Sequence, residues 1–166
     1  PGLVIYGVEN HGIISAEGVS ATISAVPRYA DVLTFSGCTD IGINNVTLGH
    51  TEEPGECSGG VLNFSQCGDV VIDRSRLFGC GTVGITAYNS RGIAIDDTEI
   101  YDCTYSAAIF YTCNDVVFAN CNIHNCGTPE LVVTDSNVLY DGEALKSLDY
   151  TFEGGKLVEY VYPDMH

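Results

Sequence analysis

Apolar and polar residues alternate in short runs along most of the chain. Leu62 and Phe64 are separated by one polar residue, and Val70 and Ile72 repeat this spacing a few residues later. A two-residue period is typical of β-strands with one buried face. Bends rich in Gly, Asn and Asp separate the runs, and no segment has the 3.6-residue spacing of an amphipathic helix. The pattern therefore predicts an all-β chain of short strands.

The same pattern returns at a fixed interval. Copies that follow F-x-x-C-x-D-V-x-I, or a close variant of it, begin 23 residues apart (64 to 87 and 87 to 110), at Phe64, Ala87 and Phe110. An earlier copy begins at Phe35, 29 residues upstream (35 to 64), because six extra residues lie between His50 and Gly59. Weaker copies span Tyr6–Ile14 and begin at Val133. The chain thus holds about six copies of one repeat.

Repetition at a fixed long period places equivalent residues of successive copies directly above one another. Each copy predicts one coil of about three short strands separated by bends. The repeated F-x-x-C-x-D-V-x-I pattern resembles the right-handed parallel β-helix repeats of the pectate-lyase-like superfamily over roughly residues 3 to 138. This resemblance implies a right-handed parallel β-helix of about six coils, for which we set the limits at residues 1–140.

The two ends of the predicted solenoid differ. The tail 141–166 departs from the repeat, and Tyr150–Tyr160 predicts a hairpin that turns at Gly154-Gly155 and caps the last coil. The first strand follows Pro1-Gly2 directly, without such a cap. We therefore expect further domains of a longer chain, or another subunit, to cover the N-terminal coil.

Charged residues at the second bend fall into neighbouring copies. Arg74 is predicted to lie over Asp97, and Arg76 over Glu99 one strand later. We expect both to be ion pairs between adjacent coils, each worth roughly 0.2–1 kcal/mol when exposed.

The charge of the chain restricts its partners. Six Lys and Arg against 22 Asp and Glu give a formal net charge of −16 and a pI of about 4.2. Nucleic acids and anionic membranes would be repelled. No apolar stretch approaches the roughly 18 residues of a membrane span. These observations argue against both partners, and the resemblance implies an extracellular or cell-surface location.

The eight cysteines follow the repeat rather than the spacing of a metal site. Two columns contain three each, namely Cys38, Cys67 and Cys113, and Cys80, Cys103 and Cys126. Ser90 and Ser136 occupy the first column in other copies, which indicates a position for small buried side chains. We therefore expect free, buried thiols and no metal site, with disulfides between stacked thiols as the alternative and with Cys57 and Cys121 outside the columns.

Side chains at the intervening positions are predicted to point outward. The predicted ligand-binding residues are Arg76, Phe78, Tyr101, Asn122, Tyr88 and Tyr111. Aromatic rings interspersed with hydrogen-bonding groups suit a sugar, which offers C–H groups and hydroxyls. The same surface would also suit packing against another domain or subunit. The insertion Thr51–Ser58 is expected to form a wall beside the third strand.

Several acidic and histidine side chains are candidate catalytic groups: Asp97, Glu99, Asp102, His124 and His50. Glycoside hydrolysis requires two carboxylates about 5 to 9.5 Å apart, and neighbouring coils allow that separation. Asp96-Asp97 resembles the paired aspartates of polygalacturonases, but the motifs that accompany them in that family are missing here.

Lyases that share this fold hold calcium with acidic residues and use an Arg or Lys as base, as the resemblance implies. Here Arg74 and Arg76 are expected to be paired already. The turn acids Asp40, Asp69 and Asp115 are expected to bond turn amides. We therefore expect no cofactor, with calcium as the alternative.

Besides a purely structural or assembly role, two functions remain open at this point. The first is a module without catalysis of its own, located outside the cell or on its surface, that binds a polysaccharide or glycan or packs on a partner. The alternative is a carbohydrate-active enzyme, either a polysaccharide lyase or a glycoside hydrolase, or a fragment of one.

Overall fold

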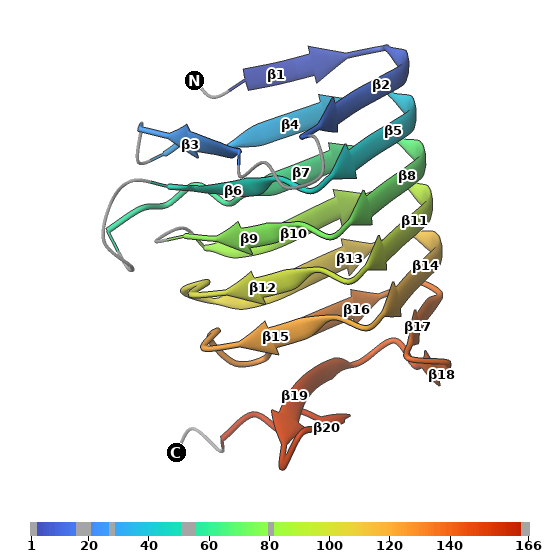
Figure 1. The fold of residues 1–166 in the computed structure, drawn as a ribbon. Helices are drawn as coiled ribbons and strands as arrows, with labels where there is room; N and C mark the ends of the chain where they lie inside the picture. Colours follow the sequence, from blue (N-terminus) through green and yellow to red (C-terminus); the bar gives the residue numbers. More distant parts are fainter. Residues whose placement is uncertain (1–2, 16–20, 27–28, 51–55, 80–81, 164–166) are drawn as a thin grey trace.

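The computed structural model describes residues 3–15, 21–26, 29–50, 56–79 and 82–163. In Figure 1 the chain descends in successive turns from β1 at the top to β20 at the bottom. The first five turns each give one strand to each of three sheets, so the predicted all-β solenoid is confirmed. Among these residues there is no helix with the length and hydropathy of a membrane span.

The three sheets are called A, B and C in the order in which a coil passes through them. Sheet A consists of β1 (Leu3–Tyr6), β4 (Leu33–Ser36), β7 (Leu62–Ser65), β10 (Val83–Tyr88), β13 (Ser106–Tyr111), β16 (Leu131–Thr134), β19 (Asp149–Glu153) and β20 (Lys156–Glu159). Sheet B consists of β2 (Glu9–Ile14), β5 (Thr39–Asn44), β8 (Gly68–Asp73), β11 (Arg91–Asp96), β14 (Asn114–Ala119), β17 (Val138–Tyr140) and β18 (Glu143–Leu145). Sheet C consists of β3 (Thr22–Ala25), β6 (Thr47–His50), β9 (Arg76–Phe78), β12 (Glu99–Tyr101) and β15 (Asn122–His124).

The register between coils follows the sequence repeat. Parallel pairing in sheet A aligns one column of partners: Phe35, Phe64, Ala87, Phe110 and Val133. This column faces inward, and each of its side chains is at most 1% exposed. The core is therefore a set of apolar columns that run along the axis of the solenoid, as the 23-residue period predicts.

The bend between sheets B and C requires left-handed backbone. Its column comprises Asn45, Arg74, Asp97 and Asn120, with φ between +44° and +56°. Asn and Asp tolerate this conformation because their short polar side chains bond locally, whereas arginine adopts it less readily.

The predicted ion pair between Arg74 and Asp97 is wrong. The Arg74 guanidinium lies 3.4 Å from Asp73 Oδ2 and donates a 3.0 Å hydrogen bond to Asn44 Oδ1. The Arg74 side chain thus turns toward Asp73, the last residue of β8, and toward Asn44 on the preceding coil.

The two ends are built differently. At the C-terminal end β19 pairs antiparallel with β16, and β19 and β20 form the predicted hairpin, in which Gly154 and Gly155 have positive φ. Sheet B ends in β18, which pairs antiparallel with β17 and was not predicted. At the other end β1 pairs on one side only, and Leu3 and Tyr6 are 57% and 72% exposed. Coverage of that coil by another domain or subunit stays a prediction.

The first cysteine column exists as predicted. Cys38, Cys67 and Cys113 each donate to the carbonyl oxygen two residues earlier, as the hydroxyls of Ser90 and Ser136 also do.

Six of the thiols are free: Cys38, Cys67, Cys103, Cys113, Cys121 and Cys126. The expectation of a free thiol is wrong for Cys57, which forms a disulfide bond. Residues 51–55 of the expected wall, and Cys80, lie outside the described residues.

Candidate functional site

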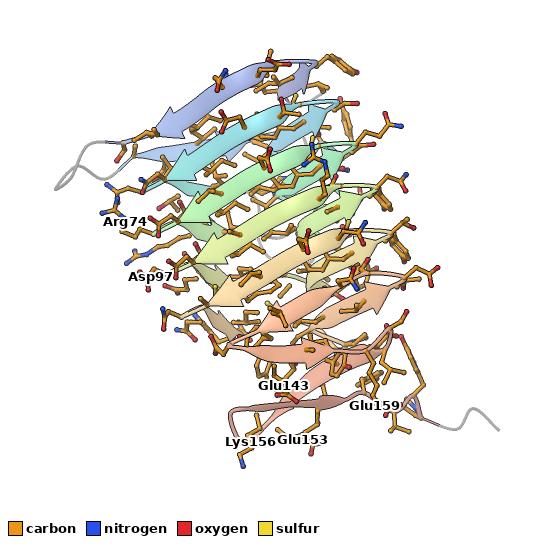
Figure 2. All side chains as sticks on the ribbon, turned by 90° about the vertical axis from the view of Figure 1, so that its right-hand side faces the viewer. Arg74, Asp97, Glu143, Glu153, Lys156 and Glu159 are labelled. Atoms are coloured by element: carbon orange, nitrogen blue, oxygen red, sulfur yellow. The ribbon has the colours of Figure 1, made fainter. Side chains whose placement is uncertain are left out.

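A shallow pocket of about 340 Å³ lies where sheet B bends into sheet C. It is lined by Arg74, Ser75, Arg76, Asp97, Thr98, Glu99, Asn120 and Asn122. Parallel pairing of β9, β12 and β15 places Arg76, Glu99 and Asn122 side by side on successive coils. In Figure 2 Arg74 and Asp97 lie one below the other at the same edge of the solenoid. The pocket therefore brings together two predicted binding residues, Arg76 and Asn122, and two candidate catalytic residues, Asp97 and Glu99.

Glu99 is held on both carboxylate oxygens. Arg76 Nε lies 3.7 Å from Glu99 Oε2, as predicted for this pair. His124 Nε2, on the next coil, lies 2.9 Å from Glu99 Oε1. Three coils thus contribute to one ionic and hydrogen-bonded group. Arg76 and His124 therefore occupy both oxygens of the Glu99 carboxylate.

Rings form a stack beside this group. The ring centroids of Phe78 and Tyr101 are 5.6 Å apart with a 19° interplanar angle, and those of Tyr101 and His124 are 5.3 Å apart with a 3° angle. Gly49 ends the stack on the other side, because a Cβ there would lie 2.4 Å from the Phe78 ring. The faces of the Phe78 and Tyr101 rings are therefore used within the stack, and His124 ends it.

The hydroxyl of Tyr101 remains a hydrogen-bond donor over the physiological pH range. Burial raises its pKa, and the nearby Glu99 carboxylate raises it further. The same holds for Tyr88 on sheet A, whose pKa is raised by burial and by the neighbouring Tyr111 and Asp31.

Tyr88 and Tyr111 form a second stack, with centroids 5.4 Å apart and rings 2° from parallel. They lie on sheet A, so the six predicted binding residues fall into two separate groups. A second pocket of about 340 Å³ lies next to this stack, where sheet A bends into sheet B. It contains Arg91, which lies 3.6 Å from Asp69 Oδ1 and which sequence reasoning missed. Asp69 was expected to bond turn amides, and its described partner is Arg91.

The remaining candidate catalytic residues have structural partners. Asp102 Oδ1 accepts a 2.6 Å hydrogen bond from Asn125 on the next coil. His50 is 3% exposed, and its Nε2 donates a 2.8 Å hydrogen bond to the carbonyl oxygen of Ala30. His50 is therefore a buried residue that anchors the start of the insertion.

The comparison with known families agrees with this architecture. The model of a family described as "right handed beta helix region" matches residues 2–156. The chain belongs to the right-handed β-helix family. No curated protein matches the sequence at a significant level.

Solved structures with a similar fold include a candidate glycosyl hydrolase from Parabacteroides merdae. It superimposes on this β-helix with a TM-score of 0.59 at 16% identity, covering 87% of this chain and 80% of that one. At this identity the likeness shows the fold alone. QnrB1, a plasmid-mediated fluoroquinolone resistance protein, matches at 9% identity and a TM-score of 0.30, with 84% and 79% coverage.

One acidic group of the β-helix has the donor set that calcium prefers. Asp73, Asp96 and Asp97 each place one carboxylate oxygen within 4.8 Å of the others. Asp96 Oδ1 is buried without a hydrogen-bond partner. Oxygen ligands from several carboxylates suit Ca²⁺, whereas the Arg74 guanidinium already occupies one side of Asp73. These three residues are the ones that would hold calcium.

Charge removal at this group gives a direct test. We expect Asp97→Asn to raise the free energy of unfolding by roughly 0.2–1 kcal/mol in chelator at low salt, because three close carboxylates repel one another. Urea denaturation of both proteins in EDTA, and then in calcium, measures the effect. If calcium stabilises the wild type and not Asp97→Asn, the group holds a cation instead.

Proposed function

We propose that this β-helix is a glycan-binding module, located outside the cell or on its surface, that holds a polysaccharide chain on the outer face of sheet C without cleaving it. The observation that supports this most is the pocket lined by β9, β12 and β15 and the bends before them. Two guanidinium groups, two carboxylates and two amides from three successive coils line this pocket, and the ring stack that carries the Tyr101 hydroxyl lies beside it. Such mixed donors and acceptors suit sugar hydroxyls.

The distribution of basic residues favours this face. The whole chain has six Lys and Arg, and two of them, Arg74 and Arg76, line this one pocket. In a protein with a net charge of −16 they provide positive donors that a neutral or weakly acidic polysaccharide can reach.

The repeat of the fold favours a polymer over a single sugar. Strands of adjacent coils lie about 4.8 Å apart, so equivalent side chains recur at a constant spacing. Arg76, Glu99 and Asn122 form one such row. His124 ends the neighbouring row of rings, on the last described strand of sheet C, and its 46% exposed side chain leaves one ring face for a sugar.

Binding without cleavage fits the finding that Glu99 and Asp102 already have partners within the protein. Glu99 already has Arg76 and His124 as partners, and Asp102 has Asn125. The pocket is shallow and open to solvent, unlike the enclosed sites in which enzymes exclude water.

A pair of arginine variants tests the proposal. Arg76 and Arg91 are 65% and 63% exposed, and each pairs with a carboxylate on an adjacent coil, but they lie at different corners of the solenoid. After a glycan array has selected a ligand, we expect Arg76→Ala to weaken its binding roughly tenfold, as loss of a charge-assisted hydrogen bond does. Arg91→Ala should bind like the wild type in isothermal titration calorimetry. Equal loss in both variants, or no glycan bound at all, contradicts the proposal.

The alternative is a carbohydrate-active enzyme, and it is favoured by Asp97 and Glu99 lining one pocket. Release of reducing or unsaturated ends from the bound polysaccharide, abolished by Glu99→Gln, would replace binding with catalysis as the function.

A further inference from the structure

Cys103 and Cys126 occupy the same place in consecutive coils. Each lies two residues after a paired position of sheet C, since Tyr101 pairs with His124. The turns stay in register beyond the strands, because Gly127 N donates a 3.0 Å hydrogen bond to the carbonyl oxygen of Cys103. Adjacent parallel strands lie about 4.8 Å apart, which falls within the 4.4–6.8 Å range of Cα separations in disulfides.

The two thiols lie on adjacent coils but differ in access. Cys126 Sγ donates a 3.8 Å hydrogen bond to the carbonyl oxygen of Ile100, on the coil that carries Cys103. Cys103 is 3% exposed, whereas Cys126 is partly exposed. The neighbouring Cys126 thiol and burial raise the pKa of Cys103, whereas the neighbouring Cys103 thiol lowers the pKa of Cys126. Cys126 is therefore the better thiolate nucleophile, with a protonated thiol directly behind it.

We propose that Cys103 and Cys126 form a thiol–disulfide exchange site that reacts with low-molecular-weight disulfides such as oxidised glutathione. The Cys126 thiolate attacks one glutathione sulfur, which forms a mixed disulfide and releases one glutathione thiolate. Cys103 then loses its proton and attacks the Cys126 sulfur, which closes the bond between the coils and releases the second glutathione. Two protein thiols are oxidised and one glutathione disulfide is reduced to two thiols.

A second pair of cysteines provides an internal comparison. Cys38 and Cys67 also occupy one column on adjacent coils, and each sulfur donates to a carbonyl oxygen of the preceding coil, of Ile5 and of Phe35. They are 0% and 3% exposed, so no thiolate there can reach a dissolved disulfide while the protein is folded. Cys113 has serines, Ser90 and Ser136, as its column neighbours, so it has no thiol partner of this kind.

Closure would affect the neighbouring ring stack. Cys103 Sγ lies 3.5 Å from the carbonyl oxygen of Tyr101, and Cys126 Sγ lies 3.5 Å from that of His124. A bond between the two sulfurs would fix the spacing of the coils at these rings. Because the test reads thiol chemistry rather than glycan binding, it is independent of the function proposed above.

The test uses the folded chain in buffers of reduced and oxidised glutathione, with free-thiol titration and peptide mapping by mass spectrometry. We expect the wild type to lose two thiols, with the new disulfide mapping to Cys103–Cys126, and its melting temperature to rise by several degrees. Cys103→Ser should stop at a mixed disulfide on Cys126, and Cys126→Ser should not react. Cys113→Ser is the matched control and should behave like the wild type.

Three outcomes would overturn the proposal. These are retention of all six described free thiols in the wild type, a new disulfide that maps to other cysteines, and glutathione attached to Cys103 when Cys126 is absent. Should a variant fail to fold, the order of alkylation by iodoacetamide in the folded wild type decides, because Cys126 must react faster than Cys103.

Discussion

Replacing Phe64 with alanine should lower the free energy of unfolding by about 3–5 kcal/mol, the range for large aromatic-to-alanine changes in a core. The Phe64 ring is fully buried and stacks on Phe35, with centroids 5.4 Å apart and a 13° interplanar angle. Its partner on the following coil is Ala87, which cannot fill the space that the ring would leave. The cavity therefore remains largely open, and the loss falls toward the upper part of the range.

Urea denaturation followed by circular dichroism measures this change. Ser65→Ala is the matched control, because Ser65 is the next residue of β7 and faces outward. We expect it to change the free energy of unfolding by less than about 0.5 kcal/mol. If Phe64→Ala and Ser65→Ala had equal effects on the free energy of unfolding, the assignment of Phe64 to the inward column of sheet A would be wrong.

Gly127→Ala should also destabilise the protein strongly, by about 1–3 kcal/mol or more. A Cβ at Gly127 would lie 2.3 Å from the carbonyl oxygen of Thr104 and 2.5 Å from that of Tyr105. Both contacts are with backbone of the preceding coil, so relief requires the two coils to separate. The Gly127 amide would then lose its hydrogen bond to Cys103 as well.

The control for this prediction is Gly42→Ala in β5. A Cβ at Gly42 meets nothing within 4 Å, and its φ is not in the left-handed region. We expect Gly42→Ala to be neutral or to stabilise by roughly 0.4–1 kcal/mol, through the lower entropy of the unfolded chain. Melting temperatures from calorimetry compare the two variants, and a loss in Gly42→Ala as large as in Gly127→Ala would contradict the steric argument.

Much of the fold could be predicted from the sequence because one number, the 23-residue repeat length, fixes the register of the parallel pairs from β7 to β16. Once Phe64, Ala87 and Phe110 are aligned, inward and outward positions follow from the two-residue period of a strand. The hairpin was also predictable, because Gly154-Gly155 lies between two alternating segments. The antiparallel strand β18 is only three residues long and was missed, although the Asp141-Gly142 turn that precedes it, with positive φ at both residues, is a hairpin signature.

The candidate site was predicted less completely. Column positions indicated that Arg76 and Glu99 would meet, and they do. They could not indicate where the long side chain of Arg74 turns at a left-handed bend, since Asp97, Asp73 and Asn44 are all nearby. They also could not show that the rings of Tyr88 and Tyr111 face each other rather than the solvent.

The constant register of sheets A and B has a consequence for how such a protein can change length. Each coil contacts only its neighbours. A tandem duplication of one whole 23-residue unit, such as 83–105, would therefore add one coil to the solenoid and leave the contacts between the other coils intact. A single residue inserted within a strand would instead move the following inward-facing side chains of that strand to the outer face of the sheet. The solenoid can therefore lengthen by whole coils, whereas insertions of single residues are tolerated only in the bends.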